Sequence, residues 1–146
     1  MKDYIVSIRL MTYNHGEFIK EAMNGIMMQE TSFPIEVVVG DDFSTDNTLN
    51  IIREFSNTEN IDIHILDRPR GEDYDLKRQE LGRLYNFQNI IENCKGKYIA
   101  ILDGDDYWTD PLKLQKQVDF LENNKAYSII THAADVFSDN VLINKK

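Results

Sequence analysis

Four short segments of the chain are rich in β-branched and other apolar residues, and polar stretches separate them. Such segments are typical of β-strands, and a continuous apolar run predicts a strand that is covered on both faces. We expect this of Ile35–Gly40, and we expect the last of the four strands to be buried as well. The predicted strands are Tyr4–Met11, Ile35–Gly40, Ile61–Leu66 and Gly96–Leu102.

Between these strands, apolar residues recur every three or four positions, which is the period of an amphipathic α-helix. Asn14, followed by Glu17, resembles a capping box and predicts a helix that runs to about Met28. A second helix is predicted over 49–55. A third is predicted over 81–94, with one apolar face made of Leu81, Leu84, Phe87, Ile90 and Ile91.

The remaining segments differ in character. Residues 67–80 are charged and contain proline and glycine, so they predict an irregular loop or lid. Asp110 before Pro111 predicts the start of another helix, with Asp110 as its N-cap and Pro111 at its first position. The stretch 127–137 is predicted as a fifth strand, and 138–140 as a turn that leads into 141–146.

Alternation of strands and helices predicts an α/β fold with a mainly parallel central sheet. In such sheets, ligands bind outside the carboxyl ends of the strands. Three of the predicted strands end there in polar sequences, which are "TYN" (12–14), "GDD" (40–42) and "DGDD" (103–106). The sequence therefore predicts a binding site at this edge of the sheet.

The sequence "DGDD" places three carboxylates close together, which raises their pKa values unless a positive charge joins them. Asp103, Asp105 and Asp106 offer the hard oxygen ligands that Mg²⁺ and Mn²⁺ prefer, and Gly104 permits a tight turn. A solvated acidic loop is the alternative. The position directly after a predicted buried strand favours the cation site.

Asp41 and Asp42 follow another predicted strand in the same way. A carboxylate at this position can accept hydrogen bonds from a nucleobase N–H group or from ribose hydroxyls. The alternative is that these acids only favour the start of the next helix, which is the interpretation we adopt for Ser44, Thr45, Asp46 and Thr48. For Asp42 we favour the functional interpretation.

Composition narrows the class of partner. The 146 residues suit one domain, and the formal net charge of −9 argues against nucleic acid, whose phosphates require basic surfaces. Phosphate chemistry is compatible with this acidity if a metal supplies positive charge locally. Cys94 is the single cysteine, and no apolar run is long enough for a membrane span. We therefore expect a cytoplasmic protein without a transmembrane segment, and a peripheral position at the inner face of the membrane stays open.

Three blocks of the sequence together resemble a family 2 glycosyltransferase with the GT-A fold, a Rossmann-like three-layer sandwich. They are "VSIRLMTYNHGEFIKEAMNGIMMQ", "IEVVVGDDFSTDNT" and "GKYIAILDGDDYWTDPLKLQKQVDFLE". The resemblance implies a nucleotide-diphosphate-sugar donor, with a UDP-sugar first among them, and Mn²⁺ or Mg²⁺ as cofactor. It also implies an inverting transfer to a glycan or lipid-linked acceptor, as in polysaccharide biosynthesis.

The resemblance carries roles to individual positions. Thr12, Tyr13 and Asn14 correspond to the strand end that lines the nucleotide pocket, and Asp42, with Asp41 beside it, corresponds to the acid that contacts base and ribose. Asp103 and Asp105 match the DXD motif around Gly104, and Asp106 is an adjoining acid that can share the metal. A basic residue is expected near the diphosphate. Arg83 is one candidate, and Arg68, Arg70, Lys77 and Arg78 are others.

The resemblance also implies an acceptor-binding half with a carboxylate base, for which residues 107–146 offer no recognisable candidate. We therefore interpret 1–146 as a single nucleotide-sugar-binding domain that lacks most of the acceptor half, with its sheet incomplete on the C-terminal side. The catalytic base is unknown, and little sugar transfer by this chain alone is expected. A catalytically inactive nucleotide-sugar-binding module is the alternative, and self-association through a sheet edge stays open.

Overall fold

The structure, a computed structural model, describes residues 2–138 and 141–143, in two compact units that span 1–115 and 116–146. The first unit contains β1 (Val6–Thr12), α1 (Ile19–Met27), β2 (Ile35–Asp41), α2 (Thr48–Arg53), β3 (Ile61–Ile65), α3 (Asp73–Leu81), α4 (Leu84–Glu92) and β4 (Tyr98–Asp103). Helix α5 (Lys113–Asn123) begins in the first unit and continues into the second, where β5 (Val136–Ser138) pairs antiparallel with β6 (Val141–Ile143).

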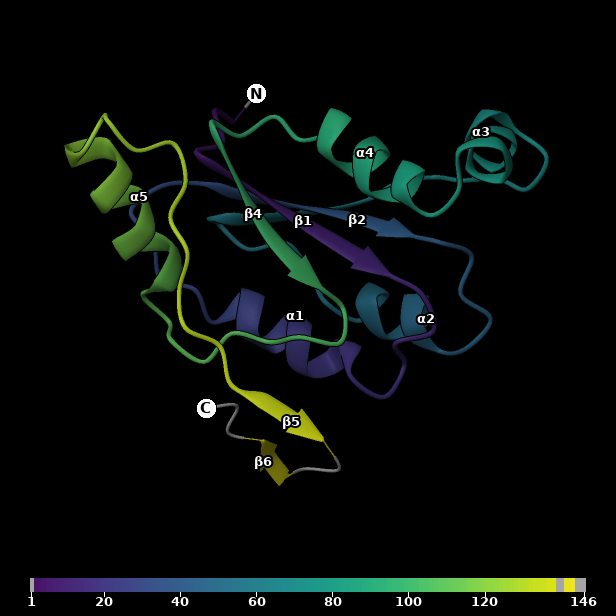
Figure 1. Cartoon of the computed structure of the whole chain (residues 1–146), viewed down its shortest axis with the longest axis horizontal. Coiled ribbons are helices and arrows are strands. Elements are labelled where there is room, and N and C mark those ends of the chain that lie inside the picture. Colours follow the sequence, from purple (N-terminus) through teal and green to yellow (C-terminus); the bar gives the residue numbers. More distant parts are fainter. Residues whose placement is uncertain (1, 139–140, 144–146) are drawn as a thin grey trace. The chain divides into compact units, whose positions relative to one another are not determined.

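The first unit is built on a four-stranded sheet in the order β3-β2-β1-β4, and every neighbouring pair is parallel (Figure 1). This arrangement confirms the mainly parallel α/β fold. The register pairs Thr12 with Asp41 and Met11 with Asp103, so three strands end at one edge of the sheet. The polar sequences that follow these strands therefore start side by side.

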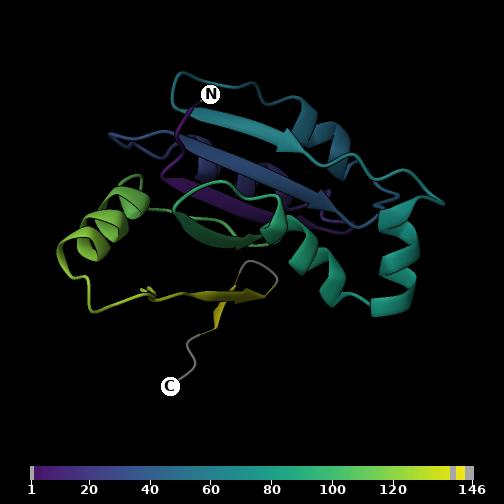
Figure 2. The same ribbon diagram turned by 90° about the horizontal axis from the view of Figure 1, so that it is seen from above.

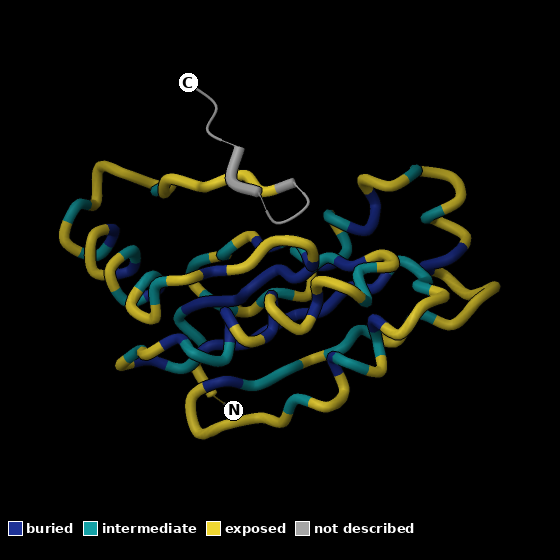
Figure 3. Tube along the Cα trace, turned by 90° about the horizontal axis from the view of Figure 1, so that it is seen from below, coloured by how far each residue is buried: buried dark blue, intermediate teal, exposed yellow. Residues whose placement is uncertain are grey.

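Helices cover both faces of this sheet. Figures 1 and 2 show α1 and α2 on one face and α3 and α4 on the other. The two central strands, β1 and β2, are buried along almost their whole length, and buried segments are dark in Figure 3. All seven residues of β2 are buried, because helices lie on both sides of it.

The loop after β4 is fixed against α1. Trp108 is only 6% exposed, which agrees with a packing role, whereas Tyr107 is 49% exposed. A Cβ atom at Gly25 of α1 would lie 2.8 Å from both the backbone nitrogen and the carbonyl oxygen of Trp108. The absence of a side chain at Gly25 therefore allows α1 and this loop to touch through their backbones.

The start of α1 differs from the prediction. The helix begins at Ile19, and Phe18 occupies the N-cap position without a side-chain cap. The capping box at Asn14 is wrong, because the Asn14 side chain accepts a hydrogen bond from the Thr45 backbone instead. Asn14 also has a φ of 52°, which ends the strand in a left-handed turn.

The irregular loop predicted over 67–80 is correct for 67–72 but wrong beyond it, since α3 occupies 73–81. This helix lacks a continuous apolar stripe, and Tyr74 and Asp75 are its buried residues. The apolar face predicted for the next helix is only partly correct. Leu81 and Leu84 are exposed, and α4 buries Tyr85, Asn86 and Ile90.

Three further predictions need correction on the C-terminal side. β4 is an edge strand in the described sheet, so Ile99 and Ile101 are exposed rather than buried. The fifth strand is limited to Val136–Ser138, and Asp139 and Asn140 of the predicted turn lie outside the described residues, as do residues 144–146. α5 begins at Lys113 rather than Pro111, although the Asp110 carboxylate accepts a hydrogen bond from the Leu112 backbone.

We predict that Gly25→Ala lowers the free energy of unfolding by about 2 kcal/mol, because the added methyl group must displace the Trp108 backbone. Urea unfolding followed by Trp108 fluorescence measures this change. Asn24→Ala is the matched control on the exposed side of the same helix turn. Equal stability of the Gly25 variant and the wild type would show that the contact carries no packing constraint.

Candidate functional site

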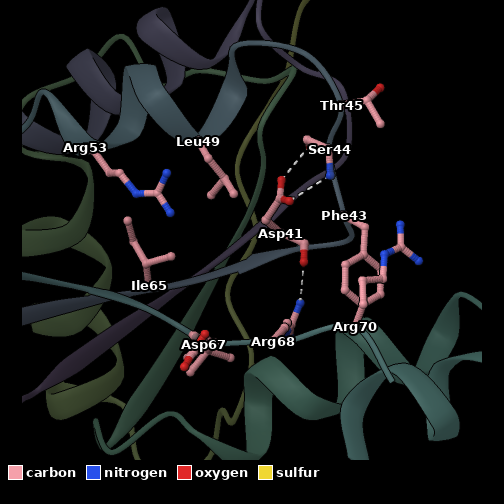
Figure 4. A pocket seen from close by; sticks show the side chains of 11 residues that line it. Asp41, Phe43, Ser44, Thr45, Leu49, Arg53, Ile65, Asp67, Arg68 and Arg70 are labelled. Atoms are coloured by element: carbon pink, nitrogen blue, oxygen red, sulfur yellow. Dashed lines mark hydrogen bonds between the residues drawn. The ribbon is translucent and has the colours of Figure 1, made fainter. Parts of the chain in front are cut away.

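Asp41 stabilises the loop that follows β2. Its carboxylate accepts hydrogen bonds from the Thr12 hydroxyl (2.8 Å), the Ser44 backbone N–H (2.8 Å) and the Ser44 hydroxyl (2.5 Å). Figure 4 shows this carboxylate directed toward Ser44. Asp41 is 6% exposed, and Phe43 within the loop has a φ of 65°. The Asp41 carboxylate is thus engaged in maintaining a tight turn.

The loop after β1 is joined to the same turn. The Asn14 backbone donates to the Ser44 hydroxyl (2.8 Å), and the Asn14 side chain accepts from the Thr45 backbone (2.8 Å). The Gly16 backbone donates to Asp46, whose pKa is lowered chiefly by the hydrogen bond from the Thr48 hydroxyl. Asn14 therefore orients two loops.

Tyr13 lies at the tip of the loop after β1 and is 56% exposed. Its neighbour Asn14 is held by the turn after β2, so the ring of Tyr13 projects from a fixed backbone. An exposed aromatic ring on a fixed loop is a suitable platform for stacking against a planar ligand.

Asp42 has a different environment from Asp41. Its carboxylate accepts two-pronged hydrogen bonds from the Arg78 guanidinium, with Nε at 2.9 Å and Nη2 at 2.7 Å from Oδ2, and a third bond from the Tyr74 hydroxyl (3.1 Å). The hydrogen bond to Asp42 raises the pKa of Arg78, and burial raises the pKa of Tyr74. Both partners belong to α3, so this helix supplies one wall beside Asp42.

Arg68 fastens the end of β2 to α4. Its guanidinium donates to the Asp41 carbonyl (3.0 Å, Figure 4), to Asn86 Oδ1 (2.6 Å) and to Asn89 Oδ1 (2.7 Å). Burial lowers the pKa of Arg68, and the guanidinium lies 3.9 Å from the centre of the Tyr74 ring. These contacts give Arg68 a structural role at the site.

The other basic candidates differ in their distance from Asp42. Of those named from the sequence, Arg78 is the one that the structure brings to Asp42, while Arg70 stacks on Phe43 at 3.6 Å. Arg83 is exposed and occupies the N-cap position of α4, and Lys77 is exposed on α3. Sequence alone could not separate Arg78 from the rest, because its segment was not recognised as a helix.

The acidic segment Asp103–Asp106 turns sharply against β1. The Gly104 backbone donates to the Met11 carbonyl, and a Cβ atom at Gly104 would lie 2.6 Å from His15 Nδ1 and 2.8 Å from Thr12 Cγ2. Gly104 is therefore required for this close approach. The segment reaches the same strand end that carries Tyr13 and Asn14.

Within the acidic segment, Asp105 and Asp106 are exposed and Asp103 is half-buried, with 41% of its side chain exposed. Desolvation raises the pKa of Asp106, and the negative charges of Asp105 and Asp103 raise it further. The three carboxylates are thus electrostatic neighbours. Among the residues that the structure describes, no three His, Cys, Asp or Glu side chains form a ready-made metal cage.

Arg9 is a residue of this site that sequence reasoning missed. It lies in the middle of β1 with 2% of its surface exposed, and its Nη2 atom donates to Asp103 Oδ1 at 2.7 Å. The guanidinium lies 4.7 Å from the centre of the Phe87 ring. A lone arginine between Ile8 and Leu10, in the middle of a predicted strand, was the available signal.

A cavity of about 460 Å³ lies near β3 and the loop after β2 (Figure 4). Its walls include Asp41, Leu49, Arg53 and Arg70, but neither Asp42 nor the acidic segment. Asp42 and the acidic segment therefore lie outside this cavity, whereas Asp41 contributes to its wall.

We predict that Asp41→Ala lowers the free energy of unfolding by about 2 kcal/mol, because three donors lose a buried charged acceptor. Asp42→Ala should have a smaller effect, since the Arg78 side chain is 22% exposed and can be solvated. Urea titrations of both variants measure the difference. Equal losses would contradict the distinction between a loop-stabilising Asp41 and a more accessible Asp42.

The described residues contain no helix that is both long and apolar enough to cross a membrane.

The model of the glycosyl transferase family 2 matches residues 7–146. A protein of Mycobacterium tuberculosis is 38% identical over 92% of this chain and 36% of its own length. The Escherichia coli protein WfaP, named as a UDP-Glc:α-D-GlcNAc-diphosphoundecaprenol β-1,3-glucosyltransferase, is 31% identical over 84% of this chain and 43% of its own length.

Solved structures give the same result for the fold. Staphylococcus aureus TarS matches with a TM-score of 0.62 and 28% identity, over 86% of this chain and 33% of that one. TarS structures in complex with UDP and with UDP-GlcNAc match similarly, with TM-scores of 0.61 and 0.60. The chain thus spans between about a third and under half of the length of these relatives. With a GT-A fold and a family match that covers almost all of its residues, the chain belongs to glycosyl transferase family 2.

Proposed function

We propose that residues 1–146 form the nucleotide-sugar-binding part of a glycosyltransferase that uses a UDP-sugar and a divalent cation. The observation that carries this proposal is the convergence of Tyr13, Asp42 and the acidic segment Asp103–Asp106 at one edge of a parallel sheet. Ligands of α/β proteins bind at this edge. Family membership supports the same location for a sugar nucleotide.

The nucleoside end of the donor is assigned to Tyr13 and Asp42. The Asp42 carboxylate can accept hydrogen bonds from a base N–H group or ribose hydroxyls, and Arg78 beside it can donate to carbonyl oxygens of a base. Tyr13 is exposed for stacking. UDP as the nucleotide is supported by the TarS complexes with UDP and UDP-GlcNAc and by the UDP-Glc in the name of WfaP.

The acidic segment fits a divalent cation. Desolvation raises the pKa of Asp106, repulsion from Asp105 and Asp103 raises it further, and the repulsion is relieved when a cation binds. Asp105 and Asp106 are exposed, and one or two carboxylates together with phosphate oxygens suffice for Mg²⁺. When bound, such a cation would neutralise the negative charge that grows on the departing diphosphate.

The remaining assignments concern the whole protein. Transfer to a glycan or lipid-linked acceptor with inversion is proposed from family membership, as is the contribution of Arg83 near the diphosphate. Thr12 and Asp41 act indirectly, by holding the loop that presents Asp42. A cytoplasmic location and self-association stay predictions.

We predict that UDP binds to the purified chain more tightly with Mn²⁺ than without it, and that Asp105→Ala removes this difference. The reason is that Asp105 offers an exposed oxygen ligand next to the bound diphosphate. Calorimetric titration of UDP with and without Mn²⁺ measures both affinities. Asp3→Ala is the matched control, because Asp3 is exposed and precedes the opposite end of β1.

A second variant separates the two ends of the nucleotide. Asp42→Ala should weaken UDP binding by about tenfold both with and without Mn²⁺, because a well-placed hydrogen bond to a charged group contributes about 1.5–3 kcal/mol. The same titrations test this expectation. Unchanged UDP affinity in Asp42→Ala, or an undiminished Mn²⁺ effect in Asp105→Ala, would contradict the corresponding assignment.

A further inference from the structure

Arg9 is a charged residue at a buried position, where its charge is energetically unfavourable. It is 2% exposed in a central strand, and burial of an ion is unfavourable unless charge and hydrogen bonds compensate it. The hydrogen bonds of the Arg9 guanidinium compensate this burial only in part. Within the described part of the chain, Nη2 is paired with Asp103, but the buried Nε and Nη1 atoms have no hydrogen-bond partner.

Packing alone does not account for an arginine at this position. An unbranched apolar side chain such as methionine could fill a similar volume beside the Phe87 ring without an unsatisfied charge. The Asp103 side chain is 41% exposed, so it does not need a buried cation for its own solvation. Arg9 thus depends on Asp103 for compensation, whereas Asp103 would be adequately solvated without Arg9.

The effect of Arg9 falls on the acidic segment. Asp103, Asp105 and Asp106 carry up to three negative charges, and Arg9 supplies one positive charge in direct contact with the first of them. The ion pair also holds the Asp103 carboxylate through Oδ1, so the orientation of this carboxylate is restricted. Three carboxylates and one arginine together carry at most two negative charges, which one divalent cation would neutralise.

We propose that Arg9 is a positioning residue that fixes Asp103 and adjusts the charge of the acidic segment, so that the segment favours a cation–diphosphate complex over the cation alone. This inference rests on the proposed function. A positive charge behind the carboxylates weakens the attraction for a free cation and strengthens that for an anion. Removal of Arg9 should therefore shift the two affinities in opposite directions.

The test compares Arg9→Met with the wild type in two titrations. Mn²⁺ alone is titrated and free Mn²⁺ is followed by electron paramagnetic resonance, and UDP is titrated calorimetrically at saturating Mn²⁺. We expect Mn²⁺ alone to bind about fivefold more tightly to the variant, and UDP about tenfold more weakly, as expected for one charge removed within a few ångströms at the effective dielectric of a protein. Damage to the fold would weaken both.

Two further variants define the charge effect. Arg9→Gln, a second neutral substitution, should shift both affinities in the same directions as Arg9→Met, whereas Arg9→Lys, which keeps the charge, should return the Mn²⁺ affinity to within about twofold of the wild type. Arg53→Met is the matched control, because it removes one exposed arginine from α2 and should change neither affinity.

The possible results separate this inference from the proposed function. If the wild type binds UDP with Mn²⁺ but both neutral variants shift the two affinities in the same direction, or shift neither, the role of Arg9 is wrong and the proposed function stands. If Arg9→Lys behaves like the neutral variants, the charge argument is overturned as well. If the wild type itself does not bind UDP in the presence of Mn²⁺, both proposals are overturned.

Discussion

The in-register parallel pairing of β1 with β2 and β4 is the constraint on which the site depends. Because Thr12 is paired with Asp41 and Met11 with Asp103, three chain segments leave the sheet at the same level. A shift of one residue in either pairing would turn every following side chain to the opposite face of the sheet. The continuous burial of β1 and β2 opposes such a shift, since both faces of these strands are packed.

Two adjacent acids, Asp41 and Asp42, have different environments because of this constraint. Asp41 is the last residue of β2 and its carboxylate lies within the turn, bonded to Thr12 and Ser44, whereas Asp42 presents its carboxylate to α3. Neighbouring residues of an extended chain point to opposite sides, so the same residue type acquires two environments. One acid maintains the loop, and the other is paired with Arg78 and Tyr74 of α3.

Much of this arrangement could be predicted from the sequence. The four strands of the sheet, their parallel orientation and the polar residues at their ends follow from local patterns, because strands that alternate with helices form parallel sheets. The capping box at Asn14 misled, because a capping pattern cannot reveal that an amide side chain has a partner 31 residues away. Helix α3 was missed because long-range contacts, such as that of Arg78 with Asp42, accompany it in place of an apolar stripe.

In the candidate site too, local patterns were predictable and long-range contacts were not. The carboxylates at the strand ends were recognisable. Arg9 was missed, and Arg78 could not be separated from the other basic candidates, because the importance of each arginine lies in the carboxylate that it contacts. Similarly, the exposure of Ile99 and Ile101 depends on the place of β4 at the edge of the described sheet, and an apolar run does not reveal its position in the strand order.

The close backbone contacts at Gly25 and Gly104 have a thermodynamic consequence for recognition. Gly104 precedes the exposed pair Asp105 and Asp106, and Trp108, which contacts Gly25, follows it. Neither contact leaves space for a methyl group, so the segment between Gly104 and Trp108 has little freedom to rearrange. The conformational entropy of this segment is lost when the protein folds rather than when a ligand arrives. A ligand that binds at these carboxylates would meet a preorganised geometry and avoid much of the ordering penalty that a mobile loop would impose.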